Sequence, residues 1–382
     1  MILSSCVVNL VGKGWLIARH GVATPPTSEP NMHSTPLRAA SIAAIVLALA
    51  SPVASADAGK TRIGGRMFFD LSSLEERYND TGKTDASSFA LDVKRFYVDI
   101  AHALDSTWKL QLTTDFTWSS SDGETQLFVK KAYLEGKFSK AAVLRVGSAD
   151  MPWISFVDKA QGFRYIEKSV VDRTKFGNSA DWGVHLGGKL GAGQQFDYAV
   201  AMVNGAGYKD PGRSKSVDFE GRIAYLPSSR IMLALGAYSG RRGKDLESSP
   251  AIHTTQRVSA MAAYVSDRTR AGIEYFKSDN WNEVNKPTGD HAKGWSVWAS
   301  QALGEQFTLT ARVDRTTPSH VRDPRSAERY AHLGLEYSLR DNLDLALVWK
   351  NGATDSSASR DGIAYTRHRR GNEVGIWGQV SF

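Results

Sequence analysis

The chain has 382 residues, with 47 Lys and Arg against 40 Asp and Glu, and a formal charge of +7. Its mean hydropathy is negative, which excludes a bundle of membrane-spanning helices but not a barrel of strands, because half of a barrel's residues face a polar interior. The charge is small for this length, and basic residues are not interleaved with aromatic ones in any one helix or patch, so no nucleic-acid partner is predicted.

The beginning of the chain carries a targeting pattern. Arg38 precedes the apolar run 42–50, and the small residues 54–56 follow as a cleavage site. The apolar run is too short to span a membrane as a helix. We therefore expect residues 1–56 to be an N-terminal extension with a cleaved signal peptide, and residues 57–382 to be the mature domain.

Two further expectations concern this leader. Met32 is placed to be the true initiator, so that residues 1–31 would come from a wrongly assigned start. Cys6 is the only cysteine and lies in the part that would be removed. The mature chain is then expected to have no disulfide, no thiol chemistry and no cysteine-based metal site.

Segments of alternating character begin at Thr61 and continue to the last residue. From Trp108 to Trp118, apolar and polar residues alternate strictly up to Thr113, and the final stretch 371–382 also alternates and ends on Phe382. A period of two is typical of strands. About 9–11 residues per segment is the length of a tilted membrane strand, and a terminal aromatic residue resembles the closing strand of bacterial outer-membrane barrels.

The connections between these segments alternate in length. The short ones lie at 104–106, 139–140, 191–193, 227–229, 266–268, 303–305 and 340–342. The long ones cover 79–88, 119–126, 150–180, 205–216, 240–253, 279–293, 315–327 and 351–370. This asymmetry predicts an all-β, 16-stranded antiparallel transmembrane barrel with short periplasmic turns, long external loops and a water-filled lumen.

The third long connection differs from the others because it is rich in apolar and basic residues. Trp153, Ile154 and Phe156 have little reason to lie in a solvated loop, so the connection is expected to fold inward against the barrel wall. It would then place five cations near the constriction: Lys159, Arg164, Lys168, Arg173 and Lys175. Alternatively, its apolar residues make subunit contacts or fold over the rim.

Short motifs along the mature chain resemble the phosphate-selective porins O and P. They include 143–147, 163–169, 181–188 and 198–205, in that order. This resemblance implies a homotrimeric, 16-stranded channel for small anions such as phosphate or polyphosphate in a Gram-negative outer membrane, with no cofactor. The chain departs from the family pattern in two places, since Lys131 stands where Asp is usual and Lys168 where Arg is usual.

The polar face of the strands supplies further candidate anion-binding residues. They are Arg95, Lys109, Lys131, Arg145 and Arg222, which join the five cations of the third connection. Rings of Arg and Lys lower the barrier to an anion, and Arg can hold phosphate oxygens in bidentate fashion. Carboxylates share the same face, so each strand Arg could instead pair with a neighbouring acid.

Two other functional classes were weighed. A barrel enzyme would need a nucleophile beside a base, and His102, His185 and His332 lack a spacing that suggests such a set, so no catalytic residue and no metal ligand is predicted. A carbohydrate-preferring or general porin would show an aromatic track, to which Tyr97, Tyr133, Tyr330 and Trp377 could contribute.

Overall fold

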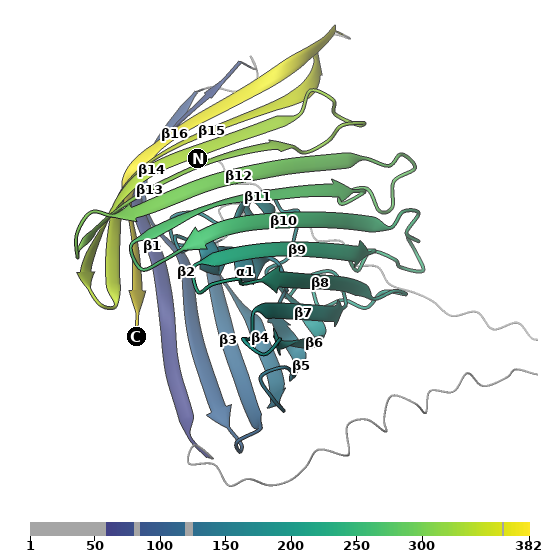
Figure 1. Ribbon diagram of the computed structural model, residues 1–382. Helices are drawn as coiled ribbons and strands as arrows, with labels where there is room; N and C mark the ends of the chain where they lie inside the picture. Colours follow the sequence, from purple (N-terminus) through teal and green to yellow (C-terminus); the bar gives the residue numbers. More distant parts are fainter. Residues whose placement is uncertain (1–58, 80–84, 119–124, 361–362) are drawn as a thin grey trace, which may run out of the picture. The chain divides into compact units, whose positions relative to one another are not determined.

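The computed structural model describes residues 59–79, 85–118, 125–360 and 363–382. Sixteen antiparallel strands close into one barrel, in which sequence neighbours pair and β1 pairs with β16 (Figure 1). The predicted all-β, 16-stranded antiparallel barrel is confirmed. The predicted leader, with Met32 and Cys6, lies outside the described residues.

The strands fall into a longer and a shorter group. The longest are β1 (Thr61–Tyr78), β2 (Ala86–Ala103), β15 (Leu343–Arg360) and β16 (Ile363–Ser381), and the shortest are β5 (Val143–Asp150), β7 (Phe196–Val203) and β8 (Asp218–Tyr225). The others are β3 (Trp108–Trp118), β4 (Thr125–Lys137), β6 (Ala180–Leu190), β9 (Ile231–Gly240), β10 (Thr255–Val265), β11 (Thr269–Asp279), β12 (His291–Ala302), β13 (Phe307–Thr317) and β14 (Ala327–Arg340).

One predicted connection is wrong. The stretch 351–370 is a strand hairpin, in which β15 and β16 continue to pair up to Arg360 opposite Ile363. Both faces of this hairpin are polar, with Asp355 and Ser356 adjacent on β15. Backbone hydrogen bonds form the ladder whatever the side chains are, so the missing apolar alternation hid the strands. Residues 80–84 of the predicted connection 79–88 and residues 119–124 of the predicted connection 119–126 lie outside the described residues.

The two faces of the wall are inverted relative to a soluble barrel. On β12, Ser296 and Ser300 point inward and are buried, whereas Trp295 and Val297 point outward and are 38% and 41% exposed. The same inversion recurs on β11, where Glu274 is buried between the exposed Ile273 and Tyr275. An outer surface of this kind is suited to lipid and not to water.

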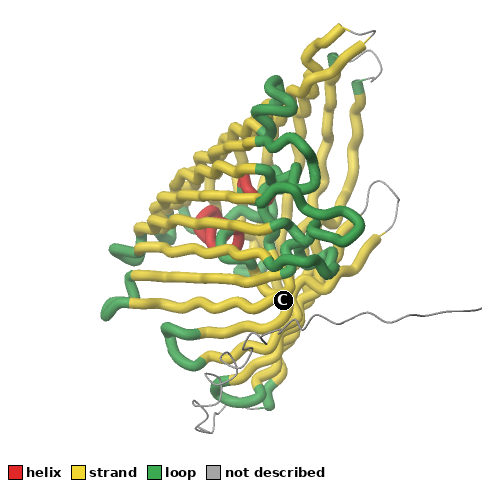
Figure 2. The backbone as a smooth tube through the Cα atoms, turned by 90° about the vertical axis from the view of Figure 1, so that its right-hand side faces the viewer, coloured by secondary structure: helices red, strands yellow, loops and turns green. Residues whose placement is uncertain are grey.

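Two short helices interrupt the connection between β5 and β6. They are α1 (Ile154–Gln161) and α2 (Val170–Arg173), which lie on the inner side of the strands (Figure 2). Their apolar side chains pack against inward-facing residues of the strands. Neither of the described helices is long and apolar enough to cross a membrane.

The last residue closes the barrel between β16 and β1. The Phe382 main chain exchanges hydrogen bonds of 3.0 and 3.2 Å with Gly65, and its ring lies 6.2 Å from the ring of Phe96. Only glycine fits at position 65, because a Cβ there would clash with the Phe382 ring and the Tyr97 carbonyl oxygen. The terminal aromatic residue is thus part of the closure.

We predict that Gly65→Leu destabilises the barrel by about 1–3 kcal/mol, the usual cost of overpacking a filled site. Gly352→Leu is the matched control, because a Cβ at that strand glycine meets nothing within 4 Å. Urea unfolding followed by the mobility shift of the folded band in gel electrophoresis measures both variants. Equal midpoints for the two would refute this role of Gly65.

Candidate functional site

Cations of the barrel wall bind the main chain of the β5–β6 connection, residues 151–179. Five of them donate to carbonyl oxygens: Arg222 Nε to Pro152 at 3.0 Å, Arg257 Nη1 to Phe176 at 2.6 Å, Arg270 Nη1 to Lys159 at 2.9 Å, Arg312 Nη1 to Lys168 at 2.5 Å and Lys350 Nζ to Ile166 at 2.8 Å. Carbonyls that have lost water need such donors. The wall therefore fixes the path of the connection.

Trp153 is the apolar anchor of the same connection. Its side chain is fully buried, its Nε1 donates to Glu274 at 2.7 Å, and its main-chain nitrogen donates to Glu220 at 2.8 Å. Met151, Val157 and other residues of the connection complete a buried cluster with strands β7 to β12. The connection thus covers one side of the inner wall.

Space remains on the opposite side of the lumen, although Tyr165 and Ile166 of the connection pack there against Phe68 and Tyr97. Three cavities of about 340, 300 and 310 Å³ lie between the connection and the wall, and Tyr97 and Arg164 line all three. Because they share these residues, the cavities adjoin one another. We call them together the passage.

Positive charge predominates around the passage. Its lining contains thirteen cationic side chains, Arg66, Lys94, Arg95, Lys130, Lys131, Lys159, Arg164, Lys168, Lys175, Lys209, Arg242, Arg270 and Lys350. It contains seven carboxylates, Asp99, Asp115, Asp150, Asp158, Glu167, Asp172 and Glu373. The excess of six positive charges is larger than the formal charge of residues 57–382, which is +5, so the passage is more basic than the barrel as a whole.

Arg164 lies at the centre of the passage but is compensated. Its guanidinium pairs with Asp158 and, at 2.9 Å, with Asp172. Burial opposes its charge, yet the two carboxylates hold the pKa of Arg164 well above its usual value. Burial would raise the pKa of Asp172, but Arg164 and Lys168 lower it overall, whereas burial leaves the pKa of Asp158 raised. Lys168 itself makes no ion pair with any residue that the structure describes.

Two β-bulges add cations to the wall of β1 to β4. The β1–β2 register skips Lys94 between Phe68 and Phe69, and the β3–β4 register skips Lys130 between Thr113 and Thr114. Each bulge turns two consecutive basic residues inward, Lys94 with Arg95 and Lys130 with Lys131, which all line the passage. A bulge re-aims side chains in this way because it adds one residue to one strand.

The ten cations predicted from the sequence divide into two groups. Six line the passage: Arg95, Lys131, Lys159, Arg164, Lys168 and Lys175. Four do not: Lys109 and Arg145 pair with Glu135, Arg173 pairs with Asp314, and Arg222 pairs with Asp197 beneath the connection. The latter four neutralise acids of the wall, which for Arg145 and Arg222 was the alternative predicted for a strand arginine.

Sequence reasoning missed several cations of the passage, above all Lys130. Counted back from the inward Lys131, period two places Lys130 on the outer face, where an unpaired ammonium in apolar surroundings would be costly. Its side chain is instead 8% exposed, and its Nζ lies 3.5 Å from the Tyr97 hydroxyl. Two consecutive lysines within an otherwise alternating strand were the signal that could have indicated the bulge.

No family model and no curated protein sequence matches the chain. Among solved structures, the outer membrane channel DcaP of Acinetobacter baumannii superposes with a TM-score of 0.61 at 14% identity, covering 87% of this chain and 100% of that one. The chain has a porin fold.

Two other solved structures agree with this. The anion-selective porin from Comamonas acidovorans has a TM-score of 0.59 at 12% identity, covering 85% of this chain and all of that one. The trimer form of OmpT, an outer membrane protein of Vibrio cholerae, has a TM-score of 0.54 at 11% identity, with 85% and 100% coverage. The resemblance to the phosphate-selective porins O and P stays a prediction.

We predict that Trp153→Ala loosens the β5–β6 connection. Removing a fully buried Trp costs about 3–5 kcal/mol, and the connection would lose its bond to Glu274. Single channels in planar bilayers should then show higher conductance and more current noise than wild type. The control is Trp295→Ala on the outer face, which should leave conductance unchanged; an unchanged Trp153→Ala channel would contradict the anchoring role.

Proposed function

We propose that the chain is an outer-membrane porin through which small anions diffuse passively. The observation that carries this proposal is the excess of six positive charges around the passage. A low-dielectric wall focuses the field of such charges and raises the local concentration of anions. The inverted faces of the wall support insertion in a membrane, and the porin fold supports a diffusion channel.

Inorganic phosphate is the anion that this proposal tests first. The Arg95 guanidinium can donate two parallel hydrogen bonds to phosphate oxygens, and Lys168 adds a point charge at the same cavities. Conduction requires weak binding at each step. The pairing of Arg95 with Asp115 at 3.1 Å is the kind of compensation that weakens a site enough for release.

Trimeric assembly, outer-membrane lipid as the surroundings and export through a signal peptide belong to the same proposal. The trimer form of the Vibrio cholerae protein supports the assembly by fold alone. The exposed apolar residues of the outer face support the lipid contact. The leader that would direct export lies outside the described residues.

A carbohydrate-preferring porin is less well supported. Sugars stack on free aromatic faces, but Phe68 and Tyr97 meet edge to face at 81°, and Lys350 Nζ lies 4.1 Å from the Trp377 ring centre. The faces of these rings are already in contact with another ring or with a cation, so they are not free to stack on a sugar. An enzyme is also less well supported, since His185 Nε2 lies 3.2 Å from the Asp181 carbonyl and His332 Nδ1 lies 3.0 Å from the Tyr330 hydroxyl.

The test is the zero-current potential of the purified protein in a planar bilayer under a potassium chloride gradient. We expect a preference for chloride, with current reduced as phosphate is added. Lys130→Gln and Lys168→Gln should each lower the anion-to-cation permeability ratio about tenfold, because the loss of one charge at roughly 6 Å in water lowers anion permeability about threefold and raises cation permeability by about the same factor. A wild-type channel without anion preference would refute the proposal, and chloride preference without phosphate block would remove phosphate from it.

The matched control for these variants is Lys277→Gln. Lys277 is exposed on the outer face of β11 and lines no part of the passage. Lys277→Gln lowers the total charge of the protein by one, as Lys130→Gln and Lys168→Gln do. It should nevertheless leave the anion-to-cation permeability ratio at the wild-type value. An equal decrease in all three variants would mean that net charge, and not the passage, sets selectivity.

A further inference from the structure

The outer face of the barrel carries a row of cations at the end where the long connections lie. Six exposed basic residues form this outer belt: Lys277 on β11, Lys293 on β12, Arg315 on β13, Arg329 on β14, Arg370 on β16 and Arg77 on β1. All share the outward face with exposed apolar residues of the same strands, as Arg315 does with Val313. None of the six lines the passage.

The belt consists of like-charge pairs directly opposite each other. Lys277 pairs in register with Lys293, Arg315 with Arg329, and Arg370 with Arg77. Such residues have Cβ atoms about 4.5–5.5 Å apart, and like charges at this separation destabilise a sheet. A source of negative charge beside the three pairs would remove this repulsion.

The protein supplies little of that negative charge. Only Arg329, among the six belt residues, has an ion pair within the described part of the chain, with Asp355 at 2.9 Å. Asp355 is shared with His368 at 2.7 Å, and Asp279 on the same face pairs with His291 at 2.7 Å. Besides Asp355 and Asp279, Glu75 is a carboxylate on the outward face of β1, two residues from Arg77. The belt therefore keeps an excess of positive charge.

The position of the belt along the strands indicates what lies beside it. Tyr275 and Trp295 lie opposite each other on the outer face, two residues nearer the middle of their strands than Lys277 and Lys293. Trp295 is also in register with Arg315. Aromatic residues of membrane barrels gather at the boundary between apolar core and headgroups. Arg370 lies four residues beyond the exposed Val374, or about 13 Å along the strand. The belt thus lies at headgroup height.

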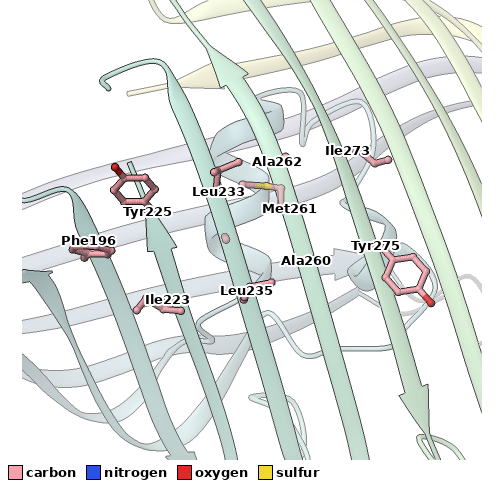
Figure 3. A pocket seen from close by; sticks show the side chains of 11 residues that line it. Phe196, Ile223, Tyr225, Leu233, Leu235, Ala260, Met261, Ala262, Ile273 and Tyr275 are labelled. Atoms are coloured by element: carbon pink, nitrogen blue, oxygen red, sulfur yellow. The ribbon is translucent and has the colours of Figure 1, made fainter. Parts of the chain in front are cut away.

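An apolar groove lies beneath one end of the belt. It has a volume of about 550 Å³ on the outer face of β7 to β11, where Ala260 and Ala262 leave room between Leu233, Leu235 and Ile273 (Figure 3). Tyr275 borders this groove, and Lys277 is the next outward residue beyond it. A molecule with apolar chains and an anionic head would match both surfaces.

We propose that the outer belt binds the phosphorylated headgroups of anionic lipids, while their acyl chains cover the apolar wall beneath. An arginine pair can hold one phosphate between two guanidinium forks, which removes the like-charge repulsion. This inference rests on the proposed membrane location but not on the proposed passage of anions.

The test measures quenching of outer-face tryptophan fluorescence by brominated lipids in vesicles. Trp295 and Trp349 are exposed on this face, and Trp295 is in register with Arg315 of the belt. With brominated phosphatidylglycerol in phosphatidylcholine vesicles, we expect stronger quenching than with brominated phosphatidylcholine. The preference should decrease about fivefold for each cation removed in Arg315→Gln/Arg329→Gln, Arg370→Gln/Arg77→Gln and Lys277→Gln/Lys293→Gln.

The controls separate the lipid from other sources of negative charge. Lys130→Gln/Lys168→Gln, in the passage, should retain the lipid preference. Free inorganic phosphate should not compete with brominated phosphatidylglycerol. In pure phosphatidylcholine the belt variants should unfold at equal or higher urea concentrations, since repulsion has been removed, which also shows that they fold.

Three outcomes would overturn the proposal. Equal quenching by the two brominated lipids in wild type would show no headgroup preference. A preference retained in all three belt variants would place it elsewhere. Dissociation of the oligomer by the belt variants, with unchanged lipid preference, would assign the belt to contacts between copies of the chain. Loss of anion selectivity in the passage variants would leave the lipid result unaffected, so the two proposals fail separately.

Discussion

The hydrogen bonds from wall cations to the main chain of the β5–β6 connection are the interaction on which the passage depends. A stretch of chain folded inside a barrel exchanges water for protein on its carbonyl groups, and each carbonyl needs a donor. Arg222, Arg257 and Arg312 supply donors while pairing with Asp197, Glu220 and Asp314. Without them the connection would have no fixed position, and neither would the Lys168 ammonium. These cations act on selectivity through the connection and do not need to meet the solute.

The connection makes the two sides of the lumen different. Trp153, Val157 and Phe176 cover the wall from β7 to β12. Polar side chains of this wall therefore form hydrogen bonds with the connection and do not face the solute. The wall of β1 to β4 borders the passage, and the two bulges enrich it in cations. A regular strand presents one inward residue in two, whereas a bulge presents two consecutive residues. The wall of β1 to β4 and the connection therefore supply nine of the thirteen cations of the passage.

The alternation of the sequence was enough to predict the barrel, because every strand inside the apolar band has one apolar and one polar face. It failed at 351–370, where both faces are polar and no alternation marks the strands. The direction of a side chain could be predicted but its partner could not: Lys109 and Arg145 do point inward, yet both bind Glu135. Lys130 was missed because a bulge shifts the count by one residue. Arg164 had a visible signal in the acids on both sides of it, Asp158 and Asp172, which fold back onto it.

Charge also fixes the register of the strands. On β13 the buried Arg312 and Asp314 pair at 2.6 Å on the inner face, while Val313 between them is 47% exposed on the outer face. A slip of one residue would exchange these faces along the whole strand. It would place an arginine and a carboxylate in the apolar band, a cost of several kcal/mol for each charge. Arg315 escapes this cost because it lies beyond the band, at the outer belt. The same strand can therefore carry cations on both faces only if their heights differ, and that difference separates the residues of the passage from those of the belt.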